Sequence, residues 1–70
     1  MPKKIRELKK MLKKAGFTSI QGRGSHEKWV HELLAEHVVV AGKDGSDAKT
    51  YLEKQVERLI KEVEQRENDA

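Results

Sequence analysis

The spacing of apolar residues changes twice along this 70-residue chain, and this change constrains its fold more than any other feature. Near the start, apolar residues recur every three or four positions, at Ile5, Leu8, Met11, Leu12 and Ala15. The same spacing returns near the end, at Ala48, Tyr51, Leu52, Val56, Leu59, Ile60 and Val63. The two stripes predict two helices, the first closed by Gly16 and the second capped by Ser46 or Asp47.

Three short segments rich in β-forming residues lie between the predicted helices, at residues 17–21, 25–33 and 37–41. Glycine-containing turns follow the first and third of them. This order predicts a single α+β domain over residues 1–70, arranged α-β-β-β-α. We expect a three-stranded antiparallel sheet with two helices on one face and the other face open. The tail, residues 64–70, is expected to fray.

Strand alternation assigns the residues of the second predicted strand to two faces of the sheet. Trp29, the only tryptophan, lies on one face with His31 and Leu33, and we place Trp29 in the core and His31 at its edge. His26 and Lys28 then lie on the open face.

The net charge of +3 conceals a strong asymmetry between the two halves of the chain. Residues 1–31 carry nine basic and two acidic side chains, whereas the remainder carries six basic and ten acidic ones. A polyanion such as RNA or DNA is therefore expected to bind the N-terminal half. On the first helix the predicted RNA contacts are Lys9, Lys10, Lys13 and Lys14. The alternative is a solvated helix face without a ligand.

Several classes of site are excluded by the residue types present. The chain has no cysteine, which removes disulfides, thiolate nucleophiles and thiolate metal sites. His26 and His31 have the wrong spacing for a zinc protease signature and would face opposite ways on a strand. We expect no metal and no small-molecule cofactor. No signal peptide and no apolar run of about 18 residues is evident, which predicts a cytoplasmic protein without membrane contact.

Residues 22–26, Gly-Arg-Gly-Ser-His, place a histidine where a cationic loop meets an apolar strand. Glycine permits backbone conformations that bring N–H groups close to a phosphate, so Gly24 and Ser25 are candidate phosphate contacts. Arg23 and Lys28 supply positive charge on either side. A histidine held there can move a proton at neutral pH, which makes His26 the candidate catalytic residue.

The combination of Lys14-Ala15-Gly16-Phe17 with Gly24-Ser25-His26, followed by Trp29, resembles the HicA-type toxins of bacterial toxin-antitoxin systems. The resemblance covers nearly the whole chain. It implies a fold like the double-stranded RNA-binding domain, metal-independent cleavage of mRNA, and inhibition by a HicB-type antitoxin. It also implies that His26 is the catalytic histidine and that Trp29 is the core aromatic residue.

The chain departs from this resemblance after its third predicted strand. Many members of the family have a proline and basic or histidine residues there, followed by a glycine-threonine start to a short helix. Residues 41–46 read Ala-Gly-Lys-Asp-Gly-Ser instead, and a longer, charged helix follows.

The sequence therefore favours a ribonuclease in which His26 removes the proton of a 2′-hydroxyl while Arg23 and Lys28 hold the phosphate. One alternative is a noncatalytic RNA-binding module that contacts phosphates and 2′-hydroxyls by shape. Another is an interaction protein whose apolar edges and charged helix bind a partner chain.

Overall fold

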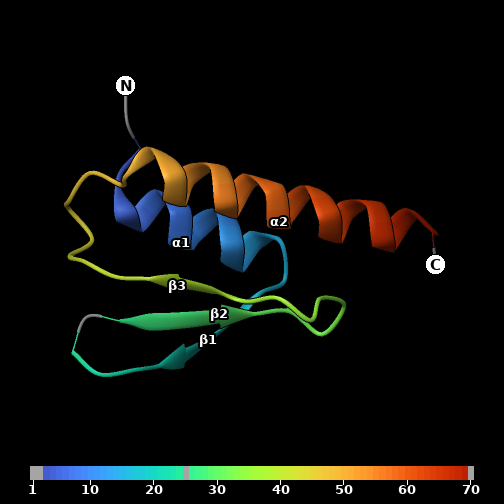
Figure 1. Ribbon diagram of the computed structural model, residues 1–70, viewed down its shortest axis with the longest axis horizontal. Coiled ribbons are helices and arrows are strands. Elements are labelled where there is room, and N and C mark those ends of the chain that lie inside the picture. The colour runs from blue at the N-terminus through green and yellow to red at the C-terminus, as the bar shows by residue number, and fades with distance from the viewer. Residues whose placement is uncertain (1–2, 25, 70) are drawn as a thin grey trace.

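The computed structural model describes residues 3–24 and 26–69, and it confirms the predicted order of elements (Figure 1). Helix α1 spans Ile5–Lys14 and helix α2 spans Thr50–Asp69. Between them lie the strands β1 (Thr18–Gln21), β2 (Glu27–Val30) and β3 (Val38–Val40). The fold is α+β, with the order α-β-β-β-α.

The strands form an antiparallel sheet in the order β1-β2-β3, with β2 in the centre. Trp29 on β2 lies opposite Ser19 on β1 and opposite Val38 on β3. In the next row, Lys28 lies between Ile20 and Val39. Successive side chains along a strand point to alternate faces of the sheet. The row that contains Trp29 and the row that contains Lys28 therefore lie on opposite faces.

Both helices cover the same face of the sheet (Figure 1). Trp29 is only 6% exposed, and Val38 and Val40 are buried with it against apolar side chains of α1 and α2. Ile20 and Val39, in contrast, are 51% and 45% exposed. The predicted placement of Trp29 in the core and of Lys28 on the open face is therefore confirmed.

The second strand is shorter than the predicted range of residues 25–33, because the chain turns directly after Val30. The Leu33 N–H donates to Nδ1 of His31 at 3.1 Å, and the Leu34 N–H donates to the His31 carbonyl at 3.1 Å. These N–H groups are thus satisfied locally instead of by a neighbouring strand.

The first turn of α1 is closed by backbone groups from the loop that joins β3 to α2. Lys4, which precedes the helix, makes no capping hydrogen bond with its side chain. The Ile5 N–H donates to the Ser46 carbonyl at 2.9 Å, and the Arg6 N–H donates to the Asp44 carbonyl at 3.1 Å. Distant carbonyls therefore satisfy two of the N–H groups that any helix leaves free at its start.

The end of α1 has the hydrogen-bond pattern of a Schellman motif. Gly16 has a φ of 96°, its N–H donates to the Lys13 carbonyl at 3.1 Å, and the Phe17 N–H donates to the Leu12 carbonyl at 3.0 Å. A Cβ at Gly16 would lie 3.2 Å from Nε2 of His31. The prediction that Gly16 closes the helix is confirmed.

The start of α2 was predicted wrongly, because the helix begins at Thr50 and not after Ser46 or Asp47. The carboxylate of Asp47 accepts a hydrogen bond from the ammonium of Lys4 at 2.6 Å, and the two residues also form a β-bridge. The Ala48 N–H donates to the Lys3 carbonyl at 2.7 Å. Pairing with the segment before α1 therefore holds this part of the chain extended.

The first turn of α2 also differs from expectation. Tyr51 belongs to the predicted apolar stripe, yet it is 68% exposed, whereas Leu52 beside it is buried. At the other end α2 continues to Asp69. Val63 is fully buried, and Glu62 and Arg66 form an ion pair of 3.8 Å one turn apart, which supports the last turns.

We predict that Gly16→Ala lowers the free energy of unfolding by about 1–3 kcal/mol, because alanine is strained at positive φ and its Cβ would press on His31. Urea denaturation followed by Trp29 fluorescence measures this loss. Gly45→Ala is the control, since a Cβ there would meet nothing. Equal losses in the two variants would show that the end of α1 does not require glycine.

Candidate functional site

His26 is exposed and lies directly before β2. Its backbone is held on both sides, since the Gly22 N–H donates to the His26 carbonyl at 2.9 Å and the His26 N–H donates to the Arg23 carbonyl at 3.1 Å. Residues 22–24 and 26 thus form a closed turn between β1 and β2. Ser25, a candidate phosphate contact, lies outside the described residues.

Gly22 has a role that the sequence did not reveal. A Cβ at this position would lie 2.9 Å from the carbonyl oxygen of His26, closer than real Cβ atoms approach backbone. Gly24, with a φ of 61°, supplies the left-handed turn, and a Cβ there would meet nothing. Gly22 is therefore the glycine whose small size lets the turn close on His26.

Two of the candidate phosphate contacts flank His26 in the sequence and are exposed: Arg23 in the turn and Lys28 on the open face of β2. Among the ion pairs found in residues 3–24 and 26–69, none involves either side chain. Their charges are therefore directed to solvent.

The four lysines predicted as RNA contacts on α1 fall into two groups. Lys10, Lys13 and Lys14 are exposed, and none of the ion pairs in the described part of the chain includes them. The side chain of Lys9 is only 19% exposed, and its ammonium donates to Asp44 at 2.8 Å and to Glu27 at 3.3 Å. The hydrogen bond to Asp44 is the largest cause of a raised pKa for Lys9, and the nearby Glu27 carboxylate contributes as well.

Lys9 joins three segments at one end of the molecule: α1, the first residue of β2, and the loop between β3 and α2. Glu27 directly follows His26 in the chain. The ion pair therefore fixes the helix that carries the other lysines next to the turn that carries His26.

The candidate cations do not share one flat surface. Lys28 lies on the open face of the sheet, whereas α1 packs against the opposite face (Figure 1). Helix α1 runs away from the turn of residues 22–26, so Lys13 and Lys14 in its last turn lie toward the other end of the sheet (Figure 1). A single ligand that contacts both groups must therefore follow α1 and pass around the sheet.

The other two histidines have different surroundings. The ring of His31 packs edge-on against Phe17, with ring centres 5.1 Å apart and an angle of 67° between the planes. Its Nδ1 accepts the Leu33 N–H, so His31 stabilises the edge of the core. His37 is exposed and precedes β3.

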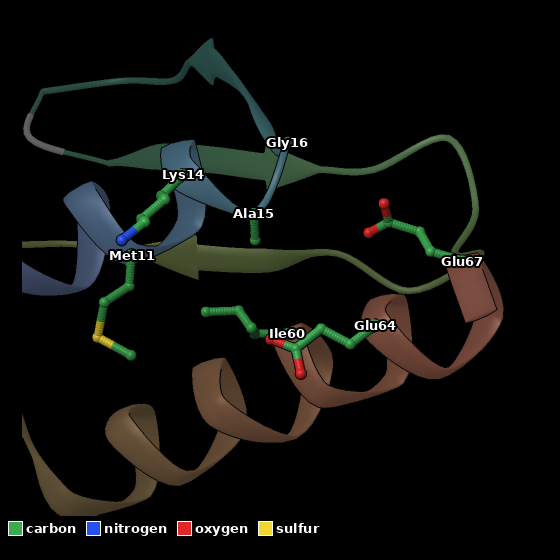
Figure 2. Close-up of a pocket in the computed structure, with 7 residues that line it drawn as sticks. All are labelled: Met11, Lys14, Ala15, Gly16, Ile60, Glu64 and Glu67. Carbon is green, nitrogen blue, oxygen red and sulfur yellow. The ribbon is translucent and has the colours of Figure 1, made fainter.

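A concave region of about 600 Å³ lies elsewhere, between the end of α1 and the second half of α2 (Figure 2). Met11, Ala15 and Ile60 form its apolar part, and Lys14 faces it from one helix while Glu64 and Glu67 face it from the other. None of the residues around His26 lines this region.

Residues 3–24 and 26–69 contain no group of three or more histidine, aspartate or glutamate side chains placed to hold a metal ion. Neither α1 nor α2 is long and apolar enough to cross a membrane.

The chain matches a known protein family over residues 5–64, which is most of its length. That family is described as "HicA toxin of bacterial toxin-antitoxin". Comparisons with curated proteins and with solved structures found no match.

We predict that Lys9→Met lowers the free energy of unfolding by about 1 kcal/mol, because it leaves Glu27 and Asp44 without their cation. Lys10→Met is the matched control on the same helix, and no loss is expected for it. Urea denaturation of the two variants measures the difference.

The difference in unfolding free energy between Lys9→Met and Lys10→Met is also expected to depend on pH. The pKa of Lys9 is raised above 10.5 in the folded chain, so the stabilisation is fully present below that pH and is lost as the pH rises through the folded pKa. A difference between the variants that stays constant well above pH 10.5 would contradict this role for Lys9.

Proposed function

We propose that this chain, which belongs to the HicA family of bacterial toxins, cleaves RNA with His26 as the general base. Membership of the family makes it a toxin of a toxin-antitoxin system. The observation that carries the proposal is the position of His26, exposed and held by hydrogen bonds of its own backbone in a turn flanked by two solvent-directed cations.

The reaction needs little from the protein, because RNA carries its own nucleophile. His26 takes the proton of a 2′-hydroxyl, and the resulting oxyanion attacks the adjacent phosphorus. Imidazole is the side chain best suited to accept a proton near neutral pH. The bond to the 5′-oxygen of the next nucleotide breaks, that oxygen takes up a proton, and a 2′,3′-cyclic phosphate remains.

Arg23 and Lys28 are suited to hold the phosphate whose charge increases in this step. The Arg23 carbonyl accepts the His26 N–H, so the guanidinium and the imidazole start from the same turn. Lys28 follows His26 by two residues and is exposed on β2. A charged donor near a developing oxyanion stabilises it more strongly than a neutral donor.

The cations of α1 serve to attract and hold the RNA strand. Lys10, Lys13 and Lys14 are exposed on the helix that Lys9 fixes beside Glu27. Such phosphate contacts give affinity without sequence preference, and the affinity falls as salt rises. In this arrangement Lys9 holds the helix and does not contact RNA.

A HicB-type antitoxin is proposed as the partner that blocks this site. The open face beside the turn of residues 22–26 exposes Ile20 and Val39 on either side of Lys28. Apolar side chains around one cation suit a protein surface that carries an acidic residue within an apolar patch. A partner bound there would cover both His26 and its neighbouring cations.

We predict that His26→Ala folds normally and cleaves RNA about 10²–10⁴ times more slowly, because an exposed general base is removed. The assay incubates labelled RNA with the protein in EDTA and identifies fragments with cyclic phosphate ends. His37→Ala, which removes another exposed histidine, is the matched control and is expected to cleave at the wild-type rate.

Two results would change this assignment. Cleavage at the wild-type rate by folded His26→Ala would remove His26 as the base. RNA binding without cleavage by the wild-type chain would favour the noncatalytic RNA-binding module.

We predict that a cognate HicB-type antitoxin slows hydrogen exchange in the turn of residues 22–26 and in β2, because it covers the face that bears His26. Exchange measured by mass spectrometry on the complex and on the free toxin tests this. Protection confined to α2, together with loss of cleavage, would show that inhibition acts from another surface.

A further inference from the structure

Among the phenylalanine, tryptophan and tyrosine side chains, only that of Tyr51 is exposed. The sequence contains one phenylalanine, one tryptophan and one tyrosine. Phe17 and Trp29 are 4% and 6% exposed, whereas Tyr51 is 68% exposed in the first turn of α2. Its side chain adds little to the core, so its large apolar surface is open to a binding partner.

A cleft of about 300 Å³ lies beside Tyr51, at the end of β3. Its apolar lining includes Ile5, Val39, Ala41 and Leu52, and Lys49 contributes a cation. Asp47 also lines the cleft, but its carboxylate is paired with Lys4 at 2.6 Å. This volume is at the lower limit for clefts that hold small ligands and suits a single flat ring system.

The cleft lies at the end of β3, the strand that pairs with β2 beside the proposed catalytic residue. Val39 pairs with Lys28, and Val40 pairs with Glu27, the residue after His26. Ala41 follows Val40 and lines the cleft. The turn between β1 and β2, the loop after β3 and the start of α2 lie at the same end of the molecule, at the left of Figure 1.

We propose that Tyr51 stacks on an unpaired base of the RNA substrate, close to the phosphodiester that His26 cleaves. Proteins recognise single-stranded RNA by stacking splayed bases on aromatic rings, whereas a base within a duplex has no free face. Lys49 is suited to hold a phosphate of the same nucleotide. This inference rests on the proposed ribonuclease function and adds a substrate class to it, RNA that is single-stranded at the cleft.

The test measures binding of a single-stranded oligoribonucleotide that carries 2-aminopurine at one position. Its 2′-hydroxyls are methylated, so that the wild-type chain cannot cleave it. Stacking on Tyr51 quenches the 2-aminopurine fluorescence. Tyr51→Ala is expected to weaken binding about 5- to 150-fold, the range for loss of one base–aromatic stack, and to abolish the quenching.

Three controls separate stacking from a general effect. Tyr51→Phe keeps the ring and is expected to bind and quench like the wild type. Leu33→Ala removes an exposed apolar side chain from the loop at the opposite end of the strands and is expected to have no effect. A duplex of the same sequence is expected to bind equally to the wild type and to Tyr51→Ala.

Each other outcome overturns the inference. Unchanged single-strand binding by Tyr51→Ala, while the wild type cleaves unmodified RNA, rejects the stacking site and leaves the proposed function intact. Loss of antitoxin binding alone in Tyr51→Ala assigns the side chain to a protein contact. Absence of any RNA binding or cleavage by the wild type rejects the proposed function together with the inference.

Discussion

Burial of one face of a three-stranded sheet under two helices is the constraint on which the other features depend. Trp29, Val38 and Val40 point into the single core, and alternation then directs Lys28 and Val39 outward. A shift of one residue in the register would reverse both sets. The apolar contacts that stabilise this small domain therefore also determine which cations are available beside His26.

The end of the sheet near His26 is held by polar contacts between distant segments. Lys9 connects α1 to Glu27 and Asp44, and the Ser46 and Asp44 carbonyls close the start of α1. These contacts position the helix, the β1–β2 turn and the β3–α2 loop relative to one another. The proposed catalytic residue and the proposed base-stacking residue are thus held by the same set of tethers.

Features set by local patterns could be predicted from the sequence. The apolar spacing gave α1 its buried side, Gly16 ended it, and alternation placed Trp29 in the core. His26 was proposed as a site residue from its position after a glycine-rich turn, and it is exposed there. Only the geometry revealed the need for glycine at position 22, since it arises from an approach of 2.9 Å to a backbone oxygen.

Features set by distant partners could not be predicted. Lys9 belonged to a run of lysines, and nothing nearby in the sequence indicated acidic partners on β2 and in the β3–α2 loop. Ser46 and Asp47 are good helix caps, yet their groups bond to the segment around the start of α1. The later start of α2 accompanies the exposure of Tyr51, which the apolar pattern had assigned to the core.

The capping of α1 by a distant loop has a consequence for the order in which the chain folds. A helix of ten residues is marginal by itself in water, and Lys4 meets its partner Asp47 only 43 positions later. During synthesis α1 therefore cannot be completed until the β3–α2 loop has left the ribosome. The turn that carries His26 is tethered to α1 through Glu27, so the emerging chain acquires its organised site only after the β3–α2 loop has been synthesised.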